Sequence, residues 1–269
     1  MRTTNAIYYN HLRNIMNDGL DSASPRGLAI KEKLAHQYRF DMTTPAITIP
    51  ERKIGYKFMA AEAAWILSGN NRVDQIEKYS KYIWEFSDNG IFYFGSYGPK
   101  IIDQLSYILD SLKKDRDSRQ AVINIWRENP YPTKDMPCST TCQFLIRDNK
   151  LNIIWNMRSS DGVLGVVYDQ FNIAMLAGYV LLLLNEVSDD FKDVTLGEGI
   201  INMGSAHIYE TNFGKVAEIL NSESAPKFTY EPFDPLNQFK SYKDLIDHLW
   251  AIAEGKNSGL SDFFIDAIR

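Results

Sequence analysis

The segment from Asp135 to Asp169 constrains the fold of this chain most, because it reads as two β-strands joined by a tight turn. The runs 138–147 and 151–157 are rich in β-branched and aromatic residues, and Asp148-Asn149-Lys150 between them has the chemistry of a turn. An apolar run over 171–185 follows, which predicts a helix that is buried on all sides. The segment therefore predicts a β-hairpin packed near a buried helix.

The remaining chain alternates helical and strand-like patterns without a repeat, a low-complexity tract or a linker. Helical spacing predicts helices over 7–19, 58–67, 101–113 and 245–253, and a second amphipathic helix within 70–90. β-rich runs predict strands in part of 28–49, over 121–126 and over 199–207. We therefore expect one α+β domain spanning residues 1–269, with a mixed β-sheet packed with helices.

Composition excludes several classes of function. The hydrophobic share of 45% allows a sizeable core, and the net charge of -5 argues against a general nucleic-acid surface. We find no apolar run of the roughly 18 residues that a membrane span needs and no signal peptide. The 2 cysteines, four positions apart, make neither a disulfide framework nor a zinc site. We expect a cytoplasmic protein without a metal, a membrane or a nucleic-acid partner.

Cys138 directly follows a proline at the mouth of the first hairpin strand, where it could act as a nucleophile. A thiolate needs positive surroundings, and Arg158, across the predicted hairpin, could supply them. A cysteine is more often a buried structural residue, and Cys142 fits that description. Strand alternation would place Cys138, Thr140 and Cys142 on one face.

Other side chains suit acid–base chemistry or anion binding. Glu62 stands among apolar residues with no cation within one helical turn, so burial would raise its pKa and suit it to proton transfer; otherwise it is a surface glutamate. His207 and Tyr209 place two hydrogen-bonding rings on one strand face. The arginine fork fits phosphate, although any single arginine can be a solvated charge, and the candidates are Arg26, Arg119 and Arg158.

Five motifs occur in a fixed order along the chain: EAAWILSGN, DSRQAVI, MPCSTTCQF, NMRSSDGVLG and GSAHIYETNF. Together they resemble the thymidylate synthase family, and within it most the phage-type deoxycytidylate (dCMP) hydroxymethylases, from about residue 26 to about residue 213. The resemblance implies a thymidylate synthase-like fold whose sheet forms a symmetric homodimer. It also implies a pyrimidine nucleoside monophosphate as substrate and 5,10-methylenetetrahydrofolate as co-substrate, in the host cytoplasm if the protein is viral.

The resemblance assigns roles to residues that match the motifs. Cys138 would attack C6 of the pyrimidine, and Glu62 would organise proton transfer through water. Arg119 would reach into the site of the neighbouring subunit. Phosphate contacts would come from Arg26, Arg158 and Ser159, other substrate contacts from Gln143, Asp161, Asp169, His207 and Tyr209, and folate contacts from Trp84, Tyr97, Asp161 and Gly165.

The sequence departs from the synthases at four places. Ser139 stands where they usually have histidine, Gln120 replaces the second arginine of the dimer-crossing pair, and the ending FFIDAIR differs from the apolar terminus that closes over folate. The serine and the ending hint at a wetter site that suits attack by water. The fourth departure, Asp169, replaces the asparagine that reads uracil.

Asp169 favours cytosine over uracil by its hydrogen-bonding pattern. A carboxylate accepts from the cytosine N4 amino group and, when protonated, donates to N3. An ionised carboxylate would face uracil O4, acceptor against acceptor, at a cost of roughly 1–3 kcal/mol. We expect a dCMP 5-hydroxymethyltransferase. The alternatives are a thymidylate synthase, a dUMP or CMP hydroxymethylase, and a catalytically silent nucleotide- or RNA-binding relative.

Overall fold

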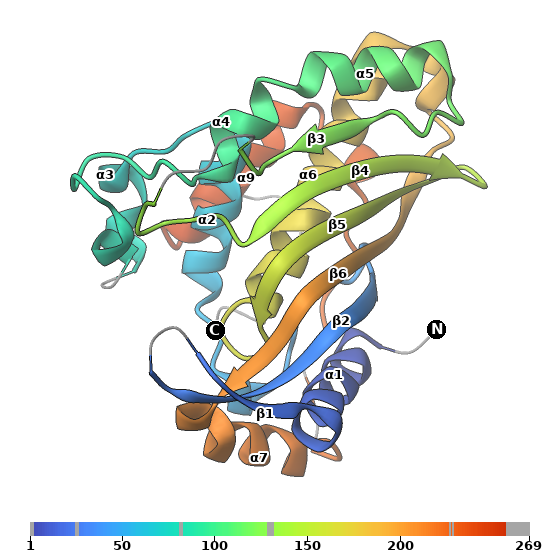
Figure 1. The fold of residues 1–269 in the computed structure, drawn as a ribbon. Coiled ribbons are helices and arrows are strands. Elements are labelled where there is room, and N and C mark those ends of the chain that lie inside the picture. Colours follow the sequence, from blue (N-terminus) through green and yellow to red (C-terminus); the bar gives the residue numbers. More distant parts are fainter. Residues whose placement is uncertain are drawn as a thin grey trace.

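A six-stranded mixed sheet organises the fold in the computed structural model, which describes residues 3–24, 27–80, 83–127, 132–225, 227 and 229–256. Its strand order is β1-β2-β6-β5-β4-β3, and every neighbouring pair is antiparallel except β5 and β6 (Figure 1). The strands are β1 (Leu20–Ala23), β2 (Ala29–Asp41), β3 (Val122–Asn124), β4 (Ser139–Arg147), β5 (Lys150–Asp161) and β6 (Thr195–Tyr209). This mixed sheet and its helices form the single α+β domain that the sequence predicts.

The hairpin of β4 and β5 is confirmed, and its turn residues explain its register. Asp148 and Asn149 have φ angles of 50° and 55°, and Arg147 pairs with Lys150, so the loop has the two left-handed residues of a type I′ turn. A register shift between Ser139 and Thr141 interrupts the opposite end of β4. This bulge breaks the simple alternation that the sequence analysis assumed for the first residues of the strand.

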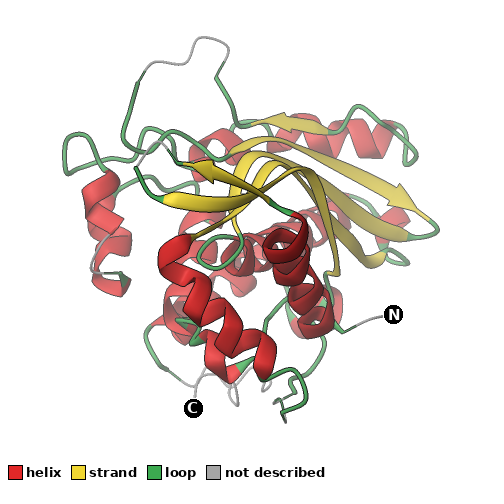
Figure 2. Ribbon diagram, turned by 60° about the horizontal axis from the view of Figure 1, so that its bottom comes forward, coloured by secondary structure: helices red, strands yellow, loops and turns green. Residues whose placement is uncertain are grey.

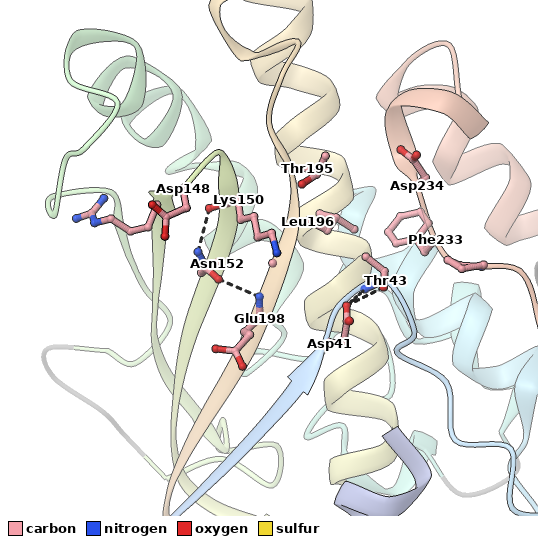
Figure 3. A pocket seen from close by; sticks show the side chains of 13 residues that line it. Asp41, Thr43, Asp148, Lys150, Asn152, Thr195, Leu196, Glu198, Phe233 and Asp234 are labelled. Carbon is pink, nitrogen blue, oxygen red and sulfur yellow. Dashed lines mark hydrogen bonds between the residues drawn. The ribbon is translucent and has the colours of Figure 1, made fainter. Parts of the chain in front are cut away.

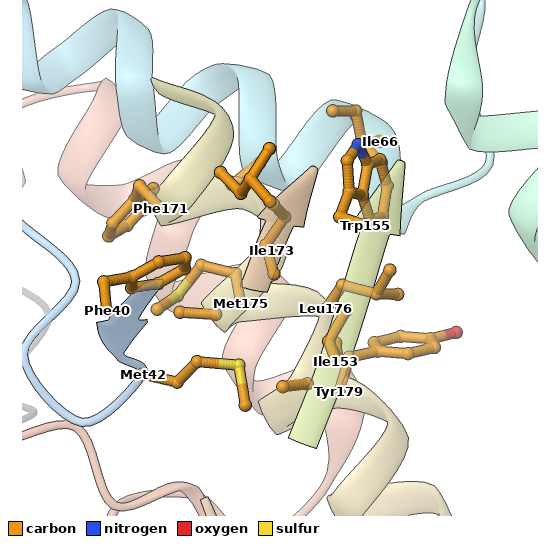
Figure 4. Packing of buried hydrophobic residues seen from close by; sticks show 14 of the residues in the cluster. Phe40, Met42, Ile66, Ile153, Trp155, Phe171, Ile173, Met175, Leu176 and Tyr179 are labelled. Carbon is orange, nitrogen blue, oxygen red and sulfur yellow. The ribbon is translucent and has the colours of Figure 1, made fainter. Parts of the chain in front are cut away.

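Helix α6 (Val166–Val187) connects the parallel strands β5 and β6, as a crossover between parallel strands requires. The predicted buried helix is confirmed, with apolar side chains on all sides that pack against the sheet and against α2, as Figure 4 shows for Phe171, Leu176 and Trp155. By length and composition α6 could cross a membrane, contrary to our reading of the sequence, but 78% of its most apolar window is buried inside the fold. The apolar composition of α6 is therefore explained by its position at the centre of the core.

Most of the helices lie below the sheet in Figure 2, and among the described residues they leave much of its opposite face, here called the open face, uncovered. Their bounds are α1 (Thr4–Asp18), α2 (Tyr56–Leu67), α3 (Val73–Ile76), α4 (Tyr97–Ile102), α5 (Leu105–Lys114), α7 (Phe213–Asn221), α8 (Pro235–Gln238) and α9 (Tyr242–Ala253). Short 3-10 turns lie at Pro50–Arg52, Glu77–Tyr79, Ile83–Phe86, Asp189–Phe191 and Glu210–Asn212. Helices predicted over 7–19, 58–67 and 245–253 are confirmed as α1, α2 and α9.

The helix predicted within 70–90 is wrong. The chain there forms α3 and two 3-10 turns, because its start is bonded to a later segment: Arg72 bridges Phe92, and the amide of Val73 donates to the carbonyl of Ile91. These contacts close a loop, and a continuous helix cannot make them. The helix predicted over 101–113 is divided between α4 and α5.

A ladder of side chains crosses four strands on the open face of the sheet. The amide of Gln37 on β2 donates to Asn202 on β6 at 3.0 Å, Asn202 donates to Asn156 on β5 at 3.0 Å, and Asn156 donates to Thr141 on β4 at 2.9 Å. These hydrogen bonds satisfy polar groups across the face that the helices do not cover. The open face is therefore polar and ordered by its own side chains.

Candidate active site

Cys138, Arg158 and Ser159 meet where β4 begins and β5 ends. The Sγ atom of Cys138 lies 3.9 Å from Nη2 of Arg158 and 3.8 Å from Oγ of Ser159. The backbone amide of Arg158 also donates to the carbonyl of Cys138 at 2.8 Å. A guanidinium and a hydroxyl beside a partly buried sulfur favour its thiolate form, so the three residues have the chemistry of an activated nucleophile.

Arg158 also holds the segment that leads into Cys138. Its Nε donates to the carbonyl of Pro137 at 2.9 Å, Nη2 donates to the carbonyl of Met136 at 3.2 Å, and Nη1 donates to Ser159 at 3.2 Å. These contacts engage each of the three guanidinium nitrogens with the protein. Arg158 therefore positions the cysteine as well as carrying the positive charge that the sequence analysis assigned to phosphate.

Ser139 lies in the core behind the cysteine. Its side chain is fully buried, and its Oγ accepts a hydrogen bond of 2.7 Å from the indole of Trp155. Its backbone amide donates to the hydroxyl of Tyr97 at 3.3 Å. The expectation that Ser139 makes the site wetter is therefore wrong, because its hydroxyl is already bound inside the core.

The turn between β5 and α6 places a second set of polar groups near the cysteine. Asp161 Oδ1 accepts from the amides of Val163 and Leu164 at 2.7 and 3.0 Å, which fixes the turn into α6. Gly165 ends this turn, and a side chain there would lie 3.5 Å from the carboxylate of Asp169. The first turn of α6 thus carries Asp169 toward the partly exposed end of the core.

Asp169 is a neutral acid at neutral pH in this setting. Burial, with smaller contributions from the negative charges of Glu62 and Asp161, raises its pKa to about 8. Burial also raises the pKa of Tyr97, and the nearby charges of Asp169 and Cys138 add to that effect. Tyr97 therefore stands within electrostatic reach of both the sulfur and the acid, and the three residues share one site.

Glu62, on α2, joins this site through a residue that the sequence analysis missed. Burial raises the pKa of Glu62, as predicted, and a hydrogen bond of 2.8 Å from Nδ2 of Asn172 to its Oε2 opposes that rise. Asn172 lies three residues after Asp169 on α6, so the two side chains share a helix face. Only that spacing could have pointed to Asn172.

His207 and Tyr209 lie on β6 beside the same turn. Asp161 pairs with His207 in the parallel register of β5 and β6, and the rings of His207 and Tyr209 pack edge to face, with centroids 5.1 Å apart. Nδ1 of His207 is buried and has no hydrogen-bond partner within the described part of the chain, so it could bond a ligand. Arg26, which the sequence analysis assigned to phosphate, lies outside the described residues.

Three predicted site residues are not brought to Cys138. Gln143 donates to the carbonyl of Arg119 at 2.8 Å, and it follows the buried Cys142 on the strand, so it faces away from the core. Arg119 and Gln120 are exposed just before β3. Trp84 is 54% exposed on the 3-10 turn at 83–86.

The residues near Asp169 fit a flat, polar co-substrate. Leu164, which is 58% exposed, offers an apolar surface between Asp161 and Gly165, and a side chain at Gly165 would lie 3.2 Å from the Asp161 carbonyl and 3.5 Å from the Asp169 carboxylate. Tyr97 adds an aromatic ring at the same place. A heteroaromatic ring with N–H donors matches this combination of apolar surface and acceptors.

A separate cavity of about 660 Å³ lies at the other end of the sheet (Figure 3). Its wall contains the hairpin turn at Asp148 and Lys150, the start of β6 and the end of β2. None of the predicted site residues lines it. Among the described residues no group of three His, Cys, Asp or Glu side chains is arranged to hold a metal ion.

Comparison with known families identifies one matching family. The family model described as thymidylate synthase matches residues 6–247. The match covers most of the chain, and it includes Cys138, Arg158, Asp169, Glu62 and Asn172.

Proposed function

Because the chain belongs to the thymidylate synthase family, and so is a one-carbon transferase that acts at C5 of a pyrimidine nucleotide, we propose that its substrate is dCMP and its product 5-hydroxymethyl-dCMP. The observation that carries the choice of cytosine is Asp169, an acid that holds its proton at neutral pH and shares a site with Cys138. The family's co-substrate, 5,10-methylenetetrahydrofolate, would supply the one-carbon unit, with Asp161, Gly165, Tyr97 and Leu164 forming its surface.

Cys138 begins the proposed reaction. Its thiolate, beside Arg158 and Ser159, forms a bond to C6 of the pyrimidine, and the electrons of the C5–C6 double bond move toward C4 and N3. A proton must arrive at N3 as this charge develops. Asp169 can donate that proton and accept a hydrogen bond from N4 with its other oxygen.

The protonation state of Asp169 changes which base edges it can match. An ionised Asp169 would oppose uracil O4, but burial raises the pKa of Asp169 to about 8, which favours the neutral acid at lower pH. A neutral carboxyl group can match either base edge, because either oxygen can carry the proton. Cytosine remains favoured because its N3 is more basic than the O4 of uracil, so an acid activates cytosine more effectively.

Uracil is the second candidate for the same reason. A neutral Asp169 can accept from N3–H and donate to O4 of dUMP without a mispaired group, so a dUMP hydroxymethylase or a thymidylate synthase is the rival function. CMP is a further candidate, because His207 and Tyr209 would contact the sugar near its 3′-hydroxyl and do not distinguish ribose from deoxyribose.

Glu62 would act in the steps that follow the addition of Cys138. Its carboxyl group is partly buried and held by Asn172. After C5 bonds the one-carbon unit of the folate, this group can accept the C5 proton through a water molecule, and tetrahydrofolate leaves as the bond between its nitrogen and the transferred carbon breaks, which leaves an exocyclic methylene on C5. The same carboxyl group can then orient a water that adds to the exocyclic methylene, while electrons return through the ring and the bond between C6 and sulfur breaks. The two events require only a proton acceptor and water.

The open face of the sheet supports a homodimer. Thr141, Asn156, Asn202 and Gln37 form an ordered polar surface there, and Arg119 is exposed at the edge of the sheet. A second copy that packs on this face would place Arg119 against the partner, where it could complete a phosphate site. The site of each subunit would then depend on both chains.

One experiment tests the base, the sugar and the reaction together. Purified protein is incubated with methylenetetrahydrofolate and dCMP, dUMP or CMP in separate reactions, and each product is identified by mass spectrometry. We expect a mass gain of one hydroxymethyl group on dCMP, without the absorbance change near 340 nm that reports dihydrofolate. A methylated product from dUMP, with dihydrofolate formation, would replace this proposal with a thymidylate synthase.

A further inference from the structure

Asn172 lies between two carboxyl groups that belong to different helices. Its Nδ2 donates to Oε2 of Glu62 on α2 at 2.8 Å, and it is separated by three residues from Asp169 on α6. Residues with this spacing are neighbours on one helix face. The crossing of α2 and α6 thus brings a neutral amide to the point where the two acids approach each other.

Two nearby acids with restricted access to water do not ionise independently. The charge on one disfavours the charge on the other, and one proton is retained until higher pH. An N–H donor stabilises the charged form of the carboxyl group that it contacts. The contact between Asn172 and Glu62 therefore selects Glu62 as the acid that ionises first.

The orientation of the Asn172 amide is tied to this choice. Its Oδ1 is buried and accepts no hydrogen bond within the described part of the chain. A flipped amide would place Oδ1 against Oε2 of Glu62, which is tolerable only if Glu62 carries a proton. Asn172 can therefore donate to an ionised Glu62 or accept from a protonated one, and in the observed orientation it donates.

We propose that Asn172 is a positioning residue that assigns the negative charge of the Glu62–Asp169 pair to Glu62 and leaves the proton on Asp169. The catalytic consequence rests on the proposed function. Glu62 would then be ready to accept the C5 proton, and Asp169 would be ready to donate a proton to the base. Asn172 itself contacts neither reacting atom in this scheme.

Two other titratable groups, Asp161 and Tyr97, lie near the Glu62–Asp169 pair. Asp161 at the end of β5 adds negative charge near Asp169, and Tyr97 on α4 lies within electrostatic reach of Asp169 and Cys138. Of these two groups, Asp161 opposes ionisation of Asp169. Neither Asp161 nor Tyr97 would stabilise a negative charge on Glu62. The hydrogen bond from Asn172 to Glu62 does stabilise it.

The first test titrates the two acids in the wild-type protein without any substrate. Glutamate and aspartate are labelled with ¹³C at the carboxyl carbon, the Glu62 and Asp169 signals are assigned with Glu62→Gln and Asp169→Asn, and both are followed with pH. We expect Glu62 to ionise at lower pH than Asp169. The reverse order would overturn the proposal whatever any Asn172 variant does.

The second test replaces the amide. In Asn172→Leu, which has similar size and no donor, the Glu62 midpoint should move to higher pH and the Asp169 midpoint to lower pH. Opposite shifts are specific to the proposed role, whereas unchanged midpoints or shifts in the same direction would overturn it. Asn185→Ala removes an asparagine of α6 that donates to the backbone carbonyls of Leu181 and Phe191, and it should leave both midpoints in place.

Activity gives an independent readout. Loss of a hydrogen bond to a charged group should lower the rate of C5–H exchange in dCMP by about 10- to 100-fold. Asn172→Gln, which retains the amide donor, should recover part of that rate, and no recovery relative to Asn172→Leu would count against the role. If no nucleotide undergoes exchange but the titrations show opposite shifts, the proposed function fails and the charge assignment stands.

Discussion

The indole N–H of Trp155 donates a 2.7 Å hydrogen bond to the hydroxyl of Ser139, the residue directly after Cys138. Both side chains are buried, with Ser139 at 0% and Trp155 at 4% exposure. A buried donor that loses its acceptor costs more free energy than the bond itself contributes. The pair therefore links the position of the nucleophile to the interior of the sheet.

Ser139→Ala should lower the free energy of unfolding by about 1–3 kcal/mol, because it leaves the Trp155 N–H buried without an acceptor. Urea denaturation measures the change. The double variant Ser139→Ala/Trp155→Phe removes both partners and should recover part of the lost stability. If the double variant is less stable by the sum of the two single changes, the hydrogen bond is not the cause.

Cys138→Ser should abolish turnover and retain binding of dCMP, because the hydroxyl keeps the shape of the site and is a poor nucleophile. Product formation and equilibrium dialysis with dCMP measure the two properties. Cys142→Ala is the matched control: that cysteine is fully buried in the core, so the change should cost stability and leave turnover in place. Turnover by the Cys138 variant would mean that another group begins the reaction.

Arg158→Lys should lower kcat by about tenfold or more as well as raise KM for dCMP, because lysine keeps the charge and cannot reproduce the contacts to Met136, Pro137 and Ser159. Steady-state kinetics separates the two constants. Arg147→Lys changes an arginine of the same hairpin that bonds backbone carbonyls away from the site, and its kinetics should match the wild type. A rise in KM alone would make Arg158 a phosphate ligand only.

Asp169→Asn should shift the substrate preference from dCMP toward dUMP by about 10-fold or more, since an amide pairs with uracil and has no acidic proton for N3. In the wild type, kcat for dCMP should fall as the pH rises through about 8, where Asp169 loses that proton. The variant should lack this decline. The measurement is kcat/KM for both nucleotides across pH, and an unchanged preference would contradict the role of Asp169.

Acid should destabilise the protein through a buried histidine pair. Burial and the neighbouring His36, 3.0 Å away, lower the pKa of His11 to about 3. Between pH 6.5 and 3 the unfolded chain therefore binds a proton that the folded chain does not, so stability falls as pH falls, by up to about 1.4 kcal/mol per pH unit for His11 alone. Urea denaturation from pH 7 to 4 should show a smaller slope for His11→Phe; equal slopes would exclude His11 as the cause.

The parts of the fold that the sequence predicts well are those set by local chemistry. The hairpin follows from Asp148 and Asn149, which tolerate the left-handed backbone of a two-residue turn. The central helix follows from its unbroken apolar run. The failed helix within 70–90 has the opposite cause, because Arg72 and Val73 are bonded to residues about twenty positions away, and no local pattern reports that contact.

The site is predictable to the same extent. The hairpin that joins Cys138 to Arg158 could be expected from sequence, whereas the contact between Glu62 and Asn172 depends on how α2 crosses α6. Ser139 was misread because a bulge in β4 directs it inward to Trp155. The protonation of Asp169 depends on burial and on two acids from other elements, which only the assembled core provides.

The unbroken segment of strand, turn and helix from Arg158 to Asp169 fixes how far apart these two residues lie. In the proposed function Arg158 would contact the phosphate and Asp169 the base, and Asp161 fixes the turn between them. A nucleotide must match that span from ring to phosphate. The chain should therefore bind dCMP more tightly than deoxycytidine, because the nucleoside has no phosphate to reach Arg158 while its base contacts Asp169.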